Sequence, residues 1–119
     1  MTRQRKATEQ ERFWRGKFGD DYAGRNATTP GELRARVALW ARILDCMVGA
    51  PPQSILEVGA NVGNNLRALR GLTGAKLMAV EPNAKARKRL VSDRVVSTMG
   101  IMSTAMELWA FAGTLTEPA

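Results

Sequence analysis

The sequence predicts an α/β fold in which short parallel strands alternate with helices. An apolar segment, 54–58, runs into a glycine-containing turn and then into a helical pattern, and a second apolar segment, 76–80, follows. Strands and helices that alternate in this order form right-handed β-α-β units, in which neighbouring strands are parallel. The length of 119 residues suits one small domain.

Residues 1–28 are predicted to form an N-terminal arm. Thr8 and Glu11 make a capping box, which predicts a short helix that begins after Thr8. Four of the seven aromatic residues of the chain lie in this polar segment, namely Phe13, Trp14, Phe18 and Tyr22. Such a density indicates either a lid or docking surface, or rings that only attach the arm to the domain, and the sequence leaves both interpretations open.

A longer helix is predicted to begin at Pro30. Thr29 is a suitable N-cap, Pro30 suits the first helical position, and Glu32 completes a capping box. Gly49 and the following Pro51-Pro52 end the helical pattern. The residues expected to face inward are Leu33, Val37, Trp40, Ile43, Leu44, Met47 and Val48. We expect this amphipathic helix to cover a sheet.

The central part of the chain, residues 29–94, also holds the predicted β-α-β-α unit. Its strands are expected at 54–58 and 76–80, and its helices at 64–70 and 84–91. The first of these helices is expected to direct Val62, Leu66 and Leu69 inward. The second is expected to expose a basic face made of Lys85, Arg87, Lys88 and Arg89.

Residues 95–119 differ in character from the rest, because they contain no Lys or Arg. A third strand could begin at 95–97, and Leu108, Trp109 and Phe111 could form one apolar turn or strand. We interpret 95–119 as an irregular tail that does not continue the same domain.

The composition excludes several classes of function. The chain has no histidine and only one cysteine, Cys46, which excludes Ser-His-Asp and Cys-His catalysis and makes a metal site improbable. The net charge of +7 fits a solubilising surface or an anionic ligand. The sequence shows no basic strand interleaved with aromatic residues of the kind that stacks on bases, so nucleic acid is not favoured as a partner. The sequence shows neither a signal peptide nor an apolar run of about 20 residues, so we expect a cytoplasmic protein without a membrane partner.

The turn between the first strand and its helix carries the candidate chemistry. Gly59 allows a sharp turn out of the strand, and Gly63 allows close approach of the helix. Glu57, at the end of the first strand, can accept a hydrogen bond from a ligand amine. Glu81, at the end of the second strand, lies where an acid typically holds a ribose diol. The alternative is a turn that needs glycine for geometry alone, which would leave both acids without a role.

These segments resemble a known enzyme family. Leu56-Glu57-Val58-Gly59-Ala60-Asn61-Val62-Gly63 resembles motif I of the class I S-adenosylmethionine-dependent methyltransferases, with Asn61 where many members have a second glycine. Ala79-Val80-Glu81-Pro82-Asn83 resembles the acid loop after their second strand. The arm, from Thr8-Glu9-Gln10-Glu11-Arg12-Phe13-Trp14 to Arg25-Asn26, is similar to methylases associated with pseudaminic acid biosynthesis. Together the resemblance covers residues 8–91.

The resemblance implies a Rossmann-like parallel sheet, S-adenosylmethionine as cofactor and a sugar of a surface glycan as methyl acceptor. The cofactor-binding residues that it implies are Glu57, Gly59, Ala60, Asn61, Gly63, Glu81, Pro82 and Asn83; no catalytic residue is implied. The family's sheet has more strands than this chain supplies. We therefore expect a truncated, N-terminal portion of such an enzyme, without methyl transfer of its own.

Two other functions compete with this interpretation. A fragment of an NAD(P)-binding domain would share the strand–turn–helix pattern, but Glu57 would then face a pyrophosphate unfavourably, whereas it suits the cationic amino group of S-adenosylmethionine. A non-catalytic basic binding module would instead show salt-dependent affinity for nucleic acid and no affinity for a nucleoside cofactor.

Overall fold

The computed structural model describes residues 6–26 and 28–104, and in them the chain folds as an α/β structure. Five α-helices and three strands occur in these residues, with one 3-10 turn before the last strand. In chain order they are α1 (Glu9–Arg15), α2 (Lys17–Arg25), α3 (Pro30–Cys46), β1 (Ser54–Val58), α4 (Asn64–Arg70), β2 (Lys76–Val80), α5 (Ala84–Ser92), η1 (Thr98–Gly100) and β3 (Ile101–Met102). The predicted parallel α/β unit is therefore present.

The sheet has the order β1-β2-β3, and both pairs of strands are parallel. Leu56 lies opposite Met78, and Ala79 lies opposite Ile101. The bounds of β1, β2 and α4 are those that the sequence predicts, because each is delimited by a turn residue or a strong change of pattern.

The third strand begins later than expected. The prediction of a strand at 95–97 is wrong, and β3 is formed by Ile101–Met102 instead. The backbone N–H groups of Val95 and Val96 donate to the carbonyl of Leu90, so these two residues close the end of α5 rather than pair with β2. Arg94 makes this return with a φ of 58°. Val95 and Val96 are buried in the core that α4 and α5 share.

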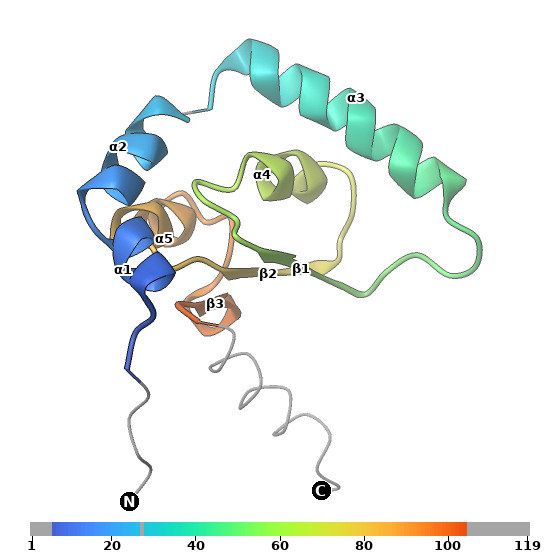
Figure 1. Ribbon diagram of the computed structural model, residues 1–119. Coiled ribbons are helices and arrows are strands. Elements are labelled where there is room, and N and C mark those ends of the chain that lie inside the picture. The colour runs from blue at the N-terminus through green and yellow to red at the C-terminus, as the bar shows by residue number, and fades with distance from the viewer. Residues whose placement is uncertain (1–5, 27, 105–119) are drawn as a thin grey trace, which may run out of the picture.

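The core lies between the sheet and the helices α4 and α5. Leu66 and Leu69 of α4 and Leu90 of α5 form one buried cluster with Ala79 of β2, which places both helices on the same face. Figure 1 shows α4 next to the strands and α3 on the far side of α4. Val62, Leu66 and Leu69 point inward as predicted, and all three are fully buried or nearly so.

Helix α3 packs on α4 instead of covering the sheet. Thr29 caps it as predicted, since its hydroxyl accepts from the N–H of Glu32. Trp40 and Leu44 reach the core cluster, yet no residue of the helix is fully buried. The prediction that Ile43, Met47 and Val48 face inward is wrong, because α4 contacts only a narrow stripe of α3 and the three side chains are exposed. The helix also ends at Cys46, ahead of Gly49.

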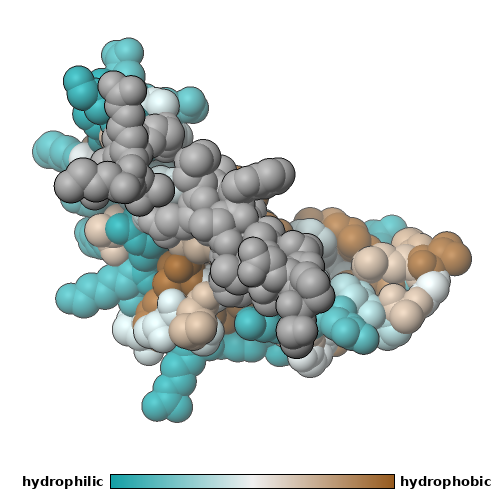
Figure 2. Space-filling model, turned by 90° about the horizontal axis from the view of Figure 1, so that it is seen from below, coloured by the Kyte–Doolittle hydropathy of each residue, from teal (hydrophilic) through white to brown (hydrophobic). Residues whose placement is uncertain are grey.

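Strand β1 forms one edge of the sheet in the described part of the chain. Its Ile55 packs against the core, so by alternation Leu56 and Val58 point to the side opposite α4. Val58 is 67 % exposed. Figure 2 views the molecule from this side, where hydrophobic side chains lie among hydrophilic ones. Among residues 6–26 and 28–104, no helix has the length and apolar character needed to cross a membrane.

One buried amide, that of Asn83, links the arm helices α1 and α2 to the domain. The side chain of Asn83 donates to the carbonyl of Trp14 (2.9 Å) and to the carboxylate of Asp20 (2.8 Å). Its own carbonyl accepts from the N–H of Ala86 and so caps α5. A small buried cluster of Ala23, Val62 and Ala86 adds an apolar contact between α2, the glycine turn and α5.

Candidate functional site

Two adjoining cavities lie at the carboxyl ends of β1 and β2. The first, of about 220 Å³, is lined by Trp14 and Tyr22 of the arm and by the residues that follow β2; we call it the arm cavity. The second, of about 180 Å³, is lined by Arg36 of α3, by Glu57 of β1 and by the glycine turn 59–63; we call it the loop cavity. Tyr22, Gly59 and Asn61 line both, so the two cavities adjoin at these three residues.

All eight residues that the sequence singles out line these cavities. Gly59 and Asn61 line both, while the others divide between them. Ala60, Gly63 and Glu57 line the loop cavity, and Glu81, Pro82 and Asn83 line the arm cavity. The geometry therefore brings together the end of each strand and the turn between them, as parallel strands that share one carboxyl edge require.

In the glycine turn every second residue has a positive φ angle. Gly59, Asn61 and Gly63 have φ values of 76°, 53° and 80°. Asparagine is among the few residues that adopt this left-handed conformation readily, which explains how Asn61 can stand between the two glycines. At Gly63 a Cβ atom would also lie 2.3 Å from a side-chain carbon of Leu90, so the close approach there is with α5 rather than between the following helix and the strand.

Glu81 joins the two strand ends. One carboxylate oxygen accepts from the backbone N–H of Asn61 and the other from that of Asn83, both at 2.7 Å. The side chain is only 6 % exposed, yet it lines the arm cavity. Glu81 thus fixes the shape of the glycine turn, a role that sequence reasoning did not assign to it.

Glu57 is half-buried in the loop cavity. Burial raises its pKa above the usual value, and the negative charge of Glu81 adds slightly to that rise. The side-chain amide of Asn65, which donates to its Oε1 at 3.1 Å, and the positive charge of Arg36 oppose the rise. A carboxylate that is costly to ionise in the folded chain is well placed to gain from a cationic ligand.

Glu57→Gln is expected to stabilise the folded chain at neutral pH. The unfolded carboxyl titrates near the usual value of 4.5 and the folded one at higher pH, so the wild-type chain loses stability as the pH rises through this interval. Glutamine does not titrate, and its advantage should therefore grow from pH 4 to pH 7. Urea unfolding at both pH values measures this, with the exposed Glu9→Gln as control. An equal difference at the two pH values would contradict the argument.

Several lining residues escape sequence reasoning. Arg36 and Asn26 lie far from the glycine turn in sequence, and Asn65 lies two residues after it. Trp14 and Tyr22 were visible only as part of an aromatic segment. Their rings meet edge to face with centroids 5.4 Å apart, and both line the arm cavity. Phe13 and Phe18 stack on one another outside that cavity and contact Trp14. Two aromatic residues of the arm therefore line the cavity, and the other two pack behind them.

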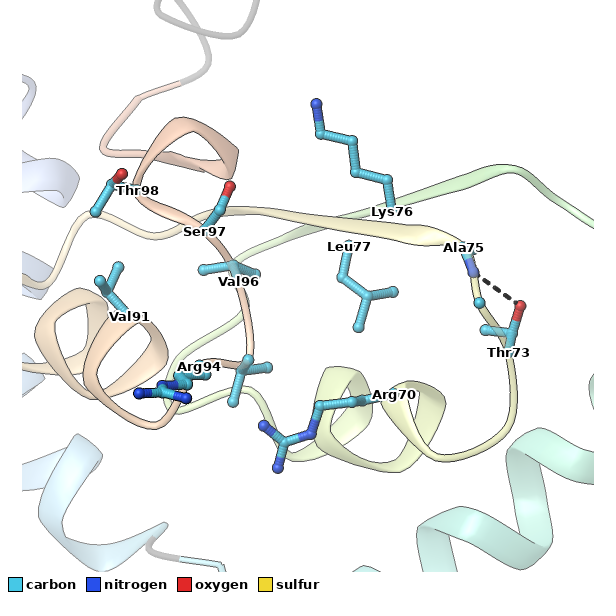
Figure 3. Close-up of a pocket in the computed structure, with 12 residues that line it drawn as sticks. Arg70, Thr73, Ala75, Lys76, Leu77, Val91, Arg94, Val96, Ser97 and Thr98 are labelled. Atoms are coloured by element: carbon cyan, nitrogen blue, oxygen red, sulfur yellow. Dashed lines mark hydrogen bonds between the residues drawn. The ribbon is translucent and has the colours of Figure 1, made fainter.

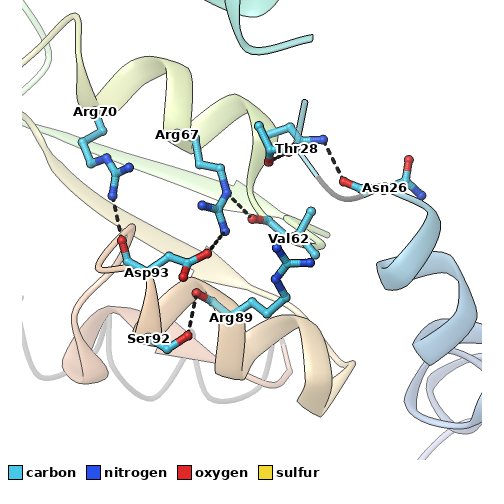
Figure 4. Close-up of polar contacts among 9 residues, drawn as sticks. Asn26, Thr28, Val62, Arg67, Arg70, Arg89, Ser92 and Asp93 are labelled. Carbon is cyan, nitrogen blue, oxygen red and sulfur yellow. Dashed lines mark hydrogen bonds and ion pairs between the residues drawn. The ribbon is translucent and has the colours of Figure 1, made fainter. Parts of the chain in front are cut away.

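A larger cavity, of about 670 Å³, lies near the amino end of β2 (Figure 3). Its floor includes Leu77 and Val96, and Arg70 and Arg94 border it. Helices α4 and α5 both end beside it, and their terminal carbonyls favour cations and disfavour an anionic ligand. Arg70 already donates to the carbonyl of Asp93, as Figure 4 shows. Arg70 therefore contacts the C-terminal end of α5.

Polar contacts join α4 to the glycine turn, to the end of α5 and to the end of the arm. Arg67 forms an ion pair with Asp93 at 2.8 Å and donates to the carbonyl of Val62, which ties α4 to the turn and to the end of α5 (Figure 4). The side chain of Asn64 donates to the carbonyl of Asn26 at the end of the arm. The described residues hold no cluster of His, Cys, Asp or Glu that could bind a metal ion.

Compared with family models, with curated proteins and with solved structures, the chain matches none.

Proposed function

We propose that the two cavities hold S-adenosylmethionine and that the chain forms part of a Rossmann-like class I methyltransferase. The observation that carries the proposal is the pair of acids at the carboxyl edge of the sheet. Glu81 faces the arm cavity and Glu57 faces the adjoining loop cavity, with the glycine turn between them. The resemblance of 8–91 to such methyltransferases points the same way.

The arm cavity suits the nucleoside. Each oxygen of Glu81 already accepts one backbone N–H, and a carboxylate oxygen can accept a second hydrogen bond, so both can also receive a ribose hydroxyl. Trp14 and Tyr22 offer aromatic surface against which a base can pack. Pro82 and Asn83 complete the wall that follows β2.

The loop cavity suits the amino-acid end of the cofactor. Glu57 can hold a cationic ammonium group, and the same carboxylate would repel the pyrophosphate of a dinucleotide, which argues against NAD(P). Because Tyr22, Gly59 and Asn61 line both cavities, the sulfur atom would lie near these three residues.

The cofactor would supply an activated methyl group on a sulfonium. Passage of that methyl group to an acceptor oxygen or nitrogen would leave the sulfur as a neutral thioether, and the acceptor's proton would pass to solvent, while Glu57 and Glu81 would hold the ammonium group and the ribose of the cofactor. The protein's contribution to such a reaction is chiefly positioning. The similarity of the arm to methylases associated with pseudaminic acid biosynthesis supports a sugar as acceptor.

Ligand-observed NMR titration of the purified chain tests the proposal. We expect S-adenosylhomocysteine to bind at least about tenfold more tightly than NAD⁺, since like charges brought together across a binding site cost several kcal/mol. Adenosine serves as the control for the nucleoside end. Equal affinity for S-adenosylhomocysteine and NAD⁺ would favour a dinucleotide site, and failure of all three ligands to bind would reject a nucleoside cofactor altogether.

A further inference from the structure

Arg36, Asn65 and Glu57 form a short hydrogen-bonded chain in the loop cavity. Nη1 of Arg36 donates to Oδ1 of Asn65 at 2.6 Å, and Nδ2 of Asn65 donates to Oε1 of Glu57 at 3.1 Å. The indole N–H of Trp40 also donates to Oδ1 of Asn65, at 3.1 Å. A cation and an anion thus lie in one small polar cavity and are joined through an amide rather than directly.

The amide holds the two charges apart in a defined arrangement. Its oxygen faces two donors, Arg36 and Trp40, and its nitrogen faces an acceptor, so only one orientation of Asn65 satisfies all three contacts. Within the described part of the chain, only one of the five N–H groups of the Arg36 guanidinium has a hydrogen-bond partner. The others can receive a ligand.

We propose that Arg36 binds the α-carboxylate of an amino-acid group while Glu57 binds its ammonium, with Asn65 as the residue that sets the distance between them. The inference rests on the proposed function and adds that the loop cavity selects a ligand with both the carboxylate and the ammonium of an amino acid. It assigns Arg36 and Asn65, which lie outside the glycine motif, as specificity-determining residues.

The charge pattern separates a zwitterion from other anionic groups. A guanidinium can hold a carboxylate or a phosphate in a two-pronged hydrogen bond. A phosphate, however, would bring further negative charge next to Glu57 in a cavity of about 180 Å³. An amino-acid group carries one positive and one negative charge, and it matches the pair that the cavity presents.

Three adenine thioethers isolate the contribution of the carboxylate. S-adenosylhomocysteine carries the whole amino acid, its decarboxylated analogue S-adenosyl-3-thiopropylamine keeps only the amine, and 5′-methylthioadenosine lacks both. The dissociation constant of each is measured by ligand-observed NMR on the full chain and on Arg36→Gln, Arg36→Lys and Asn65→Leu. The matched control is Arg34→Gln, an exposed arginine on the same helix.

We expect Arg36→Gln to weaken binding of S-adenosylhomocysteine by about 10–100-fold, the scale for losing a hydrogen bond between charged groups. Binding of the other two thioethers should change less than about twofold in Arg36→Gln, and Arg36→Lys should recover part of the loss. Asn65→Leu should weaken both ligands that carry the amine, because it also releases Glu57. Binding of 5′-methylthioadenosine reports whether each variant is folded.

The outcomes separate this inference from the proposed function. Equal affinity of the wild-type chain for S-adenosylhomocysteine and 5′-methylthioadenosine would overturn the inference and leave the nucleoside site in place. The same would follow if Arg36→Gln and Arg34→Gln behaved alike. Failure of the wild-type chain to bind any of the three thioethers would overturn the proposed function itself.

Discussion

Gly19→Ala is expected to displace the arm from the domain and to weaken ligand binding at least about tenfold. A Cβ atom at this position would lie 1.7 Å from the carbonyl oxygen of Trp14 and 2.8 Å from the side-chain nitrogen of Asn83. The first contact is with the backbone of α1, so no side chain can rotate to relieve it. Overpacking of this kind costs about 1–3 kcal/mol or more. The loss should include the hydrogen bond between Asn83 and Trp14.

Hydrogen exchange of the amides in residues 9–25 measures the displacement, and titration with S-adenosylhomocysteine measures the loss of affinity. The matched control is Gly24→Ala in the same helix, where the nearest atom to a new Cβ is the ammonium nitrogen of Lys85 at 3.8 Å. That variant should be as stable as the wild type or up to about 1 kcal/mol more stable, because alanine favours the helix. Similar exchange in both variants would show that the arm is not held by the contact at Gly19.

Glu81→Ala is expected to lower the free energy of unfolding by about 2–5 kcal/mol and to weaken S-adenosylhomocysteine binding by a further 1–3 kcal/mol. Two backbone N–H groups, that of the half-buried Asn61 and that of the buried Asn83, would lose their acceptor. Each such group costs about 1–3 kcal/mol when it is left without a partner. The loss of affinity follows separately, because the ribose diol would lose both of its acceptors.

Glu81→Gln separates the two effects. Glutamine keeps one acceptor oxygen but presents an N–H group to the second backbone donor, so its stability should fall between those of the wild type and Glu81→Ala. Calorimetric titration at a temperature where each variant is folded gives the affinity. Glu9→Ala removes an exposed acid and should change both quantities by less than about 0.5 kcal/mol. Wild-type affinity in Glu81→Gln would show that the ribose is not held by this carboxylate.

The β-α-β unit could be predicted closely because local signals agree with the final packing there. Strand β1 leads into a turn that requires glycine, and α4 begins directly after Gly63, whose φ of 80° ends the turn. The apolar residues of α4 repeat at helical spacing, and the same residues form the core. Where local propensity and tertiary contacts favour the same structure, sequence reasoning is reliable.

The elements that were misjudged depend on neighbours that the sequence does not reveal. Val95 and Val96 have the composition of a strand, but the carbonyl of Leu90 takes their N–H groups. Helix α3 has a broad apolar face of which only a stripe meets α4. The predicted apolar turn or strand of Leu108, Trp109 and Phe111 lies outside the described residues. In each of the first two cases a tertiary contact overrides a local preference.

The site could be predicted only where it follows the glycine motif. Arg36 did leave a signal, since it interrupts the apolar stripe formed by Leu33, Val37 and Trp40 on α3, but a single arginine in such a stripe is not informative without the fold. Asn83 lines the arm cavity as the sequence predicts, and its side chain also attaches the arm and caps α5. The sequence thus predicts which residues lie at the site, but not that some of them, such as Glu81 and Asn83, also hold the fold together.

The attachment of the arm through Asn83 makes ligand binding and arm closure reciprocal. A ligand in the arm cavity contacts Trp14 and Tyr22 only while α1 and α2 are docked, so its affinity is reduced by whatever fraction of molecules has the arm open. By the same thermodynamic linkage, if docking of the arm increases the affinity for the ligand, bound ligand stabilises the docked arm by the same free energy. Ligand concentration therefore acts on the opening equilibrium of helices α1 and α2, and the protease resistance of these two helices becomes a measure of occupancy at the strand ends.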